Sequence, residues 1–451
     1  MLQRILRSFI VLMVIASLGL QPAVPLAAGI PIVRDTEIEN TIRTWSTPIF
    51  RAAGLDPLAV DIYIVNDKGI NAFVAGGQKL FLNTGLLMRS ENANQVIGVI
   101  AHEVGHIQGG HLARVHDALS NATVETILAM VLGVAAGVAS GRPDVGQAII
   151  IGGQDAALRS FLHYSQTQEG AADNAAMRLL DATGQSSRGL LDFLRTMEDQ
   201  ELLAVGRQDP YLRSHPLTRD RINALEAHVG RSRYTDAPSP QAHEAMYDRM
   251  AAKLTAFLEP AATTLRQYPE SDPSAVARYA HAIAWYRSGN LAKALQAVDS
   301  LIAEQPEDPY YHELKGQMLF EAARPAEALG PYQTAVQLLP AAPLLRFELA
   351  RVQLALNDPA LIEEAIVNLR TGLMREPDSA PAWRQLAIAY GRNGQMGESA
   401  LAQAEEALLQ GRADEAIYHA GKAERLLTRG SRLWLQAQDV QRLAEQKATE
   451  N

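Results

Sequence analysis

The sequence predicts two architectures in one chain: a mainly helical α+β domain with a small sheet, followed by an all-α solenoid of helical hairpins. Two observations support this prediction. The first half combines short β-branched runs with amphipathic helix patterns, whereas the second half repeats with a period of 34 residues. The 451 residues suffice for two or three domains, and 47% apolar with 20% charged residues is typical of a folded protein.

Composition and charge exclude several classes of protein. The formal net charge is −9, which argues against a nucleic-acid-binding protein because such proteins usually carry a basic surplus. The chain has no cysteine, so disulfides, zinc–thiolate sites, iron–sulfur clusters and thiol catalysis are all excluded. The lack of cysteine also suits an oxidising compartment, where a stray thiol would be a liability.

The N-terminus has the pattern of a secretory signal peptide over residues 1–28. Arg4 and Arg7 form a basic start, residues 9–20 form an apolar run, and small residues end the segment at Ala28. The run is too short to span a membrane as a helix. We therefore expect export and cleavage near Ala28, and an uncleaved membrane anchor is the alternative.

The first half of the mature chain, residues 29–235, is expected to form the α+β domain. Three short runs bounded by turn residues predict strands: Val60–Val65, Asn71–Val74 and Leu80–Asn83. Two segments carry apolar residues at helical spacing, Ala93–Gly109 and Gln166–Thr183. The apolar run Ile127–Ala139 between them has 13 residues, too few to span a bilayer. We expect that run to be a buried helix, and contact with a membrane surface or a cover over a functional site are the alternatives.

The second half has the pattern of a tetratricopeptide array. Positions 34 residues apart carry residues of the same kind: Ala282 and Gly316, Trp285 and Leu319, Ala294 and Ala328, Pro306 and Pro340. Small residues let two antiparallel helices approach closely, and the proline ends the second helix of each pair. We expect a repeat domain over residues 272–447, joined to the first domain by a linker and connecting helix over 236–271. An unrelated helical bundle is the alternative.

One short motif predicts catalytic chemistry: His102-Glu103-Val104-Gly105-His106. Positions i and i+4 of a helix share a face, so His102 and His106 can bind one metal ion. Glu103 can then hold a water molecule beside the metal and accept its proton. The alternative is a polar helix face with two solvated histidines, but the apolar stretch 96–101 before the motif favours a buried helix.

The third ligand decides the type of metal site. A metzincin needs a histidine where this chain has Leu112, and His111 falls one residue short. A thermolysin-like site takes a carboxylate from a second helix instead. Glu169 offers that carboxylate, and Asp173 lies one turn later, where it can accept a hydrogen bond from a ligand histidine. We therefore expect one Zn²⁺ per chain, with an exposed acidic helix face as the alternative.

These motifs resemble the gluzincin metalloprotease family that contains HtpX and the CAAX prenyl proteases. Two further stretches support the resemblance. The family's edge strand and the strand after it look like Asn71-Ala72-Phe73-Val74 and Leu82-Asn83-Thr84-Gly85-Leu86-Leu87. The family's late His-Pro…Arg motif looks like Ser214-His215-Pro216 with Arg219 and Arg221. The resemblance spans residues 60–225 and implies a zincin-like metalloprotease domain.

The resemblance also implies roles outside the metal motif. His215 would be either a donor that stabilises the oxyanion or a fourth zinc ligand that keeps the enzyme idle, unless it is only a His-Pro turn. Arg221 would support the transition state or the structure, and Arg219 would lie at the surface. A substrate would pair with the edge strand by strand addition, unless that strand merely completes the sheet. The edge strand would be formed by Asn71, Ala72, Phe73, Val74 and Ala75.

A signal peptide, this protease domain and a tetratricopeptide tail together resemble the periplasmic family members that act as protease and chaperone. The resemblance implies a periplasmic zinc endopeptidase for unfolded or misassembled envelope proteins. Its repeats would recruit substrates or the outer-membrane assembly machinery, and no nucleic-acid partner is expected. The alternatives are a chaperone or scaffold with minor proteolysis and an anchored inner-membrane protease. The complete set of His102, Glu103, His106 and Glu169 argues against a dead enzyme.

Overall fold

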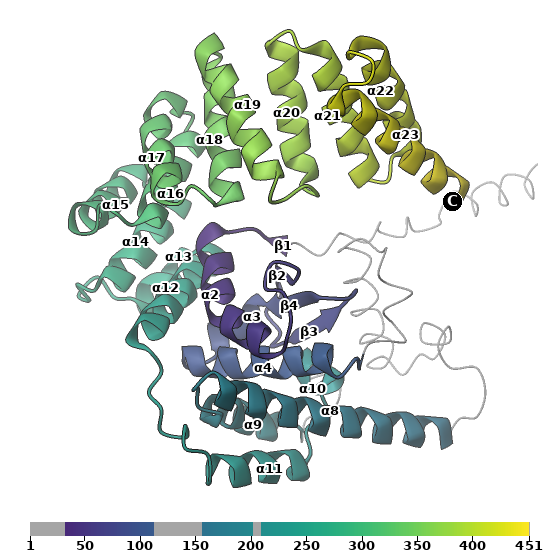
Figure 1. The fold of residues 1–451 in the computed structure, drawn as a ribbon. Helices are drawn as coiled ribbons and strands as arrows, with labels where there is room; N and C mark the ends of the chain where they lie inside the picture. The colour runs from purple at the N-terminus through teal and green to yellow at the C-terminus, as the bar shows by residue number, and fades with distance from the viewer. Residues whose placement is uncertain (1–31, 112–155, 202–208, 451) are drawn as a thin grey trace, which may run out of the picture.

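The computed structural model describes residues 32–111, 156–201 and 209–450 (Figure 1). The predicted signal peptide, residues 1–28, and the apolar run Ile127–Ala139 lie outside these ranges. None of the helices within them combines the length and the apolar character that crossing a membrane requires.

A four-stranded sheet of order β1-β2-β4-β3 lies among the first helices. Its strands are β1 Ile32–Val33, β2 Asp61–Val65, β3 Ala72–Ala75 and β4 Lys79–Asn83. β2 and β4 run parallel, whereas β3 is antiparallel to β4. The turn between β3 and β4 passes through Gly76 and Gly77, whose φ angles of 54° and 91° favour glycine. The three predicted strands are therefore confirmed, and β3 forms one edge of the sheet.

Helices make up most of this domain: α2 Thr36–Ala52, α3 Thr84–Arg89, α4 Ala93–Gln108, α8 Ala156–Ala182, α9 Arg188–Glu201, α10 Pro210–Ser214 and α11 Arg219–Val229. α4 is the central helix, because it packs against α2, α8, α9 and β3. It begins after Asn92, whose side chain accepts a hydrogen bond from the Gln95 N–H. Its residues 95–106 are all buried, so the predicted buried helix is confirmed.

α8 is longer than predicted and lies very close to α4. Within the described residues it runs from Ala156, ahead of the predicted start at Gln166, and no glycine or proline interrupts it before Gly170. At Gly105 of α4, an added Cβ would lie 2.7 Å from the carbonyl oxygen of Ala172 in α8. Small residues on both helices therefore bring the two predicted motifs together.

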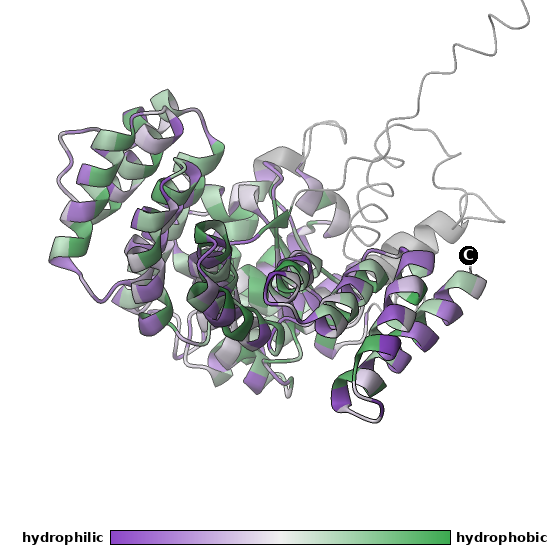
Figure 2. Cartoon of the chain, turned by 90° about the horizontal axis from the view of Figure 1, so that it is seen from above, coloured by the Kyte–Doolittle hydropathy of each residue, from purple (hydrophilic) through white to green (hydrophobic). Residues whose placement is uncertain are grey.

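The second half consists of antiparallel helix pairs, which confirms the tetratricopeptide prediction. An added Cβ at Gly316 would lie 2.6 Å from the ring of Tyr332, so the small residue is needed where the two helices of a pair meet. The array curves over the first domain (Figure 1), and its helices carry both polar and apolar residues (Figure 2). The helices are α14 Ala275–Arg287, α15 Leu291–Glu304, α16 Pro309–Glu321, α17 Pro325–Leu338, α18 Pro343–Leu356, α19 Pro359–Leu373, α20 Ala380–Arg392, α21 Met396–Leu409, α22 Ala413–Leu426 and α23 Arg432–Glu450.

The predicted connecting segment contains α12 Gln241–Leu258 and α13 Ala261–Gln267. α12 contributes to two cores at once. Tyr247 and Met250 pack in the core around the sheet, whereas Ala252 and Ala256 pack in the core of the first repeats. The connecting helix is therefore an integral part of both halves.

Buried and half-buried charged groups also join the two halves at α12. Arg249 of α12 forms ion pairs with Glu37 of α2 and with Asp308, which caps α16. Lys253 lies 3.2 Å from the same Glu37 carboxylate, which also accepts a 2.8 Å hydrogen bond from the Tyr279 hydroxyl of α14. Removing the repeats would therefore leave charged groups of α2 and α12 without their partners.

Candidate metal centre

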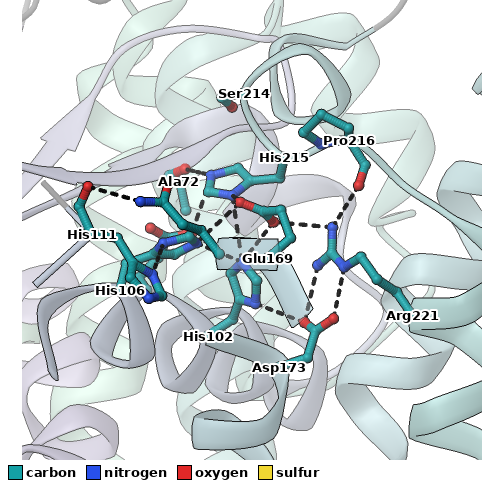
Figure 3. A network of polar contacts seen from close by, with 12 residues as sticks. Ala72, His102, His106, His111, Glu169, Asp173, Ser214, His215, Pro216 and Arg221 are labelled. Atoms are coloured by element: carbon teal, nitrogen blue, oxygen red, sulfur yellow. Dashed lines mark hydrogen bonds and ion pairs between the residues drawn. The ribbon is translucent and has the colours of Figure 1, made fainter. Parts of the chain in front are cut away.

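Four side chains from three parts of the fold converge on one buried point (Figure 3): His102, His106, Glu169 and His215. α4 supplies His102 and His106, α8 supplies Glu169, and His215 directly follows α10. One nitrogen or oxygen atom of each lies within 4.8 Å of the others. The structure thus brings together the three predicted ligands and the residue for which the sequence left two roles open.

The predicted ligand atoms lie at short range. His102 Nε2 is 3.1 Å from His106 Nε2 and 3.3 Å from Glu169 Oε2. His106 Nε2 is 3.3 Å from Glu169 Oε1. All three residues are buried, with at most 7% of their surface exposed. Two imidazole nitrogens and one carboxylate form the donor set of an open, thermolysin-like catalytic site.

The Glu103 carboxylate is a second indication of a metal site. Both oxygens are buried, and neither accepts a hydrogen bond from the residues that the structure describes. Oε1 lies 3.4 Å from His215 Nε2. A buried carboxylate is costly unless a cation or a hydrogen-bond donor satisfies it. The donor set and this carboxylate, which accepts no hydrogen bond from the described residues, therefore fit a divalent metal with a water molecule beside it.

Asp173 and Arg221 contact the candidate ligands His102 and Glu169 and orient them. His102 Nδ1 lies 2.8 Å from Asp173 Oδ1, which leaves Nε2 of His102 free for a metal. Arg221 donates from Nε and Nη2 to the two Asp173 oxygens at 2.6 and 3.0 Å, and its Nη1 lies 3.0 Å from Glu169 Oε2. Because the guanidinium holds two carboxylates, the geometry favours the structural role for Arg221. Arg219 is exposed, as expected.

His215 connects the cluster to the sheet. Its Nδ1 lies 3.2 Å from Glu169 Oε1 and 3.4 Å from His102 Nε2. Its Nε2 lies 3.2 Å from the carbonyl oxygen of Ala72, which can accept the Nε2 proton. The ring of Tyr211 stacks on the imidazole at a centroid distance of 4.6 Å. His215 therefore has Nδ1 at the group of candidate metal ligands and Nε2 at the edge strand.

The edge strand is buried as whole residues, and the carbonyl of Ala72 is directed to His215 rather than to β4. The side chains of the five predicted residues are buried: Asn71, Ala72, Phe73, Val74 and Ala75. The Asn71 carbonyl accepts a 3.0 Å hydrogen bond from the Asn83 N–H of β4. Backbone groups alternate in direction along a strand, so the next carbonyl, that of Ala72, faces away from β4 and meets His215.

Comparison with known proteins assigns the domain. Residues 34–229 match the pattern of Peptidase family M48. The chain contains a family M48 metalloprotease domain. The beta-barrel assembly-enhancing proteases of Yersinia pestis and Escherichia coli K12 are each 24% identical to it over 401 residues, which covers 87% of this chain and 80% of theirs. Metalloprotease YcaL of Escherichia coli is 26% identical over 174 residues, covering 38% of this chain and 63% of YcaL.

Electrostatics in the M48 site also favour a bound cation. Burial alone would lower the pKa of His102, but hydrogen bonds with Asp173 and Glu169 raise it to about 10. Burial would raise the pKa of Glu169, but His215 and the other two histidines hold it well below its usual range. Without a metal, a protonated His102 therefore supplies positive charge beside the carboxylates. A divalent cation can supply positive charge in its place and release that proton.

The sequence reasoning missed two contacts of the M48 site. His111, set aside as one residue short of a metzincin ligand, has its Nδ1 3.0 Å from Nδ1 of His106. The glycine pair before His111 could have indicated this contact, because glycines after a helix permit a sharp return of the chain. Arg221 and Asp173 lie 48 residues apart, and no local sequence pattern indicates that pairing.

Proposed function

We propose that this chain is a periplasmic zinc endopeptidase that cleaves unfolded or misassembled envelope proteins during outer-membrane protein assembly. The main observation is the buried set of His102, His106 and Glu169 beside the Glu103 carboxylate, which accepts no hydrogen bond within the described part of the chain. The alignment with beta-barrel assembly-enhancing proteases over 87% of the chain supports the assembly context. The expected signal peptide supports the periplasm.

His102, His106 and Glu169 would hold one Zn²⁺ and leave a position open for water. Such a metal lowers the pKa of a bound water toward ~7 and polarises a substrate carbonyl. Glu103 accepts the proton of the attacking water on its carboxylate and passes it to the leaving amine. Asp173 keeps the proton of His102 on Nδ1, so that Nε2 remains a ligand.

Substrate would bind as an added strand along β3. Backbone pairing of this kind tolerates many sequences, which suits a protease for unfolded segments. His215 occupies the position where a substrate strand would pair with Ala72, because its Nε2 lies 3.2 Å from the Ala72 carbonyl oxygen. We propose that His215 is a fourth ligand at rest, and that a substrate strand pairing with Ala72 displaces it. The alternative role is a permanent oxyanion donor. The two roles predict opposite effects of His215→Ala on turnover: a gain for a resting ligand and a loss for an oxyanion donor.

The repeats would recruit substrates or components of the outer-membrane assembly machinery. Their array curves over the protease domain (Figure 1) and supplies none of the four clustered ligand candidates. A chaperone or scaffold that works through the repeats is the second candidate function. The two candidates separate in cells, because a chaperone would keep its effect on outer-membrane assembly after loss of the Glu103 carboxylate.

The test is zinc content and casein cleavage of the mature chain, measured beside three variants. Glu103→Gln should retain zinc and lose proteolysis, because the base is removed while the ligands remain. His106→Ala should lose zinc first and activity with it. Glu270→Gln, at an exposed position outside the site, is the matched control and should behave as the unaltered chain. Near-normal turnover by Glu103→Gln would refute the assigned role.

A further inference from the structure

The turn that ends α4 has the geometry of a Schellman motif. Gly110 has a φ of +60°, its N–H donates to the Ile107 carbonyl at 3.1 Å, and the His111 N–H donates to the His106 carbonyl at 3.2 Å. In this motif the residue after the left-handed position folds back onto the residue four positions before that position. The contact between those two residues is ordinarily apolar.

Here the two residues that the motif brings together are His106 and His111. Their Nδ1 atoms are 3.0 Å apart, and their rings meet edge-on at an interplanar angle of 79°. Gly109 leaves room for this arrangement, because an added Cβ there would lie 2.3 Å from Nε2 of His111. On the other side, the His111 carbonyl accepts a 3.4 Å hydrogen bond from Gln168, the residue before Glu169.

The proton positions follow from the proposed metal site. His106 points Nε2 toward His102 and Glu169, and a nitrogen that binds a metal carries no proton. The proton of neutral His106 is therefore on Nδ1, where it needs an acceptor. Nδ1 of a neutral His111 can be that acceptor if His111 carries its own proton on Nε2.

We propose that His111 is a positioning residue: its Nδ1 accepts a hydrogen bond from His106 Nδ1–H and fixes the orientation of that ligand. This inference rests on the proposed function, because it concerns the second histidine of the zinc site. The two histidine ligands would thus be oriented differently, His102 by the carboxylate of Asp173 and His106 by a neutral imidazole. A neutral acceptor adds no further negative charge beside Glu103 and Glu169, whose carboxylates are already buried there.

Two variants of the full-length mature chain separate a hydrogen-bond acceptor from mere packing. His111→Asn places an amide oxygen near the position of the imidazole Nδ1, whereas His111→Leu has a similar shape without an acceptor. We would measure zinc affinity by competition with a chelating indicator, and the melting temperature of the metal-free protein. Loss of an outer hydrogen bond to a metal ligand weakens metal binding by about 10–100-fold.

His111→Leu should therefore lose about 10–100-fold in zinc affinity, while His111→Asn should stay within a few-fold of the unaltered chain. The metal-free melting temperatures of both variants should be unchanged, which a purely structural role would not produce. Equal affinities for all three proteins, or equal losses in both variants, would overturn the inference. An unaltered chain that binds no zinc would refute the proposed function itself, and with it this inference.

Discussion

Arg221 gives the sharpest test of how the site is held together. Arg221 is buried, with 4% of its surface exposed. It donates to both oxygens of Asp173 and to the Pro216 carbonyl, and it lies 3.0 Å from Glu169. Arg221→Met removes this charge, which leaves the buried Asp173 carboxylate without its main cation and takes one contact from Glu169. Breaking a buried ion pair in this way costs about 3–5 kcal/mol in the free energy of unfolding.

The stability of Arg221→Lys should lie between that of the unaltered chain and that of Arg221→Met. Lysine keeps the positive charge but cannot form the planar fork that reaches both Asp173 oxygens, so we expect a loss of about 1–3 kcal/mol. Arg219→Met is the matched control, because Arg219 lies on the same helix, α11, and is exposed. Exposed substitutions away from such networks usually change stability by less than about 0.5 kcal/mol.

Urea unfolding of the three variants, with and without zinc, measures these losses. The zinc affinity of Arg221→Met should also fall, because Asp173 no longer holds His102 and Glu169 loses a contact. Unchanged stability and unchanged zinc affinity of Arg221→Met would refute this reasoning. If Arg221→Met unfolds like Arg219→Met and binds zinc normally, yet turns over about 100-fold more slowly, Arg221 acts on the transition state instead.

Two further substitutions test other parts of the chain. His215→Ala should raise basal casein cleavage if His215 is a resting ligand. A loss of about 10²–10³ in turnover would instead show an oxyanion donor. Unchanged kinetics would exclude both roles. Burial raises the pKa of Glu313 from 4.5 to about 8 beside Thr36 and Lys253, so the folded chain loses stability as the pH rises from about 4.5 to about 8. Glu313→Gln should therefore stabilise the protein by about 1–3 kcal/mol at pH 8 and by less at pH 5; an equal effect in urea unfolding at both pH values would contradict the shift.

The parts of the site that could be predicted from sequence are those set by helical periodicity. His102 and His106, and Glu169 and Asp173, each lie four residues apart, so one face of one helix holds each pair. The small residues on both helices predicted their close approach, which Gly105 confirms. The tetratricopeptide array was predictable for the same reason, because its contacts recur at a fixed spacing.

The remaining features depend on contacts between distant segments. The pairing of Arg221 with Asp173 joins α11 to α8, and the ion pairs of Arg249 join α12 to α2 and to the residue before α16. No local pattern encodes either contact. The approach of His111 to His106 depends on the left-handed backbone at Gly110, which turns the chain off the helix and invalidates a prediction based on helical spacing.

The most direct test of the central claim is the zinc-edge anomalous signal in crystals of the mature protein. The account predicts one strong peak per chain, at about 2.0–2.2 Å from His102 Nε2, His106 Nε2 and a Glu169 oxygen and, in the resting protein, from His215 Nδ1. The Glu103 carboxylate should lie beside the metal without binding it directly. A peak held by other residues, or no peak in zinc-loaded crystals that cleave casein after dissolution, would contradict the proposed catalytic site.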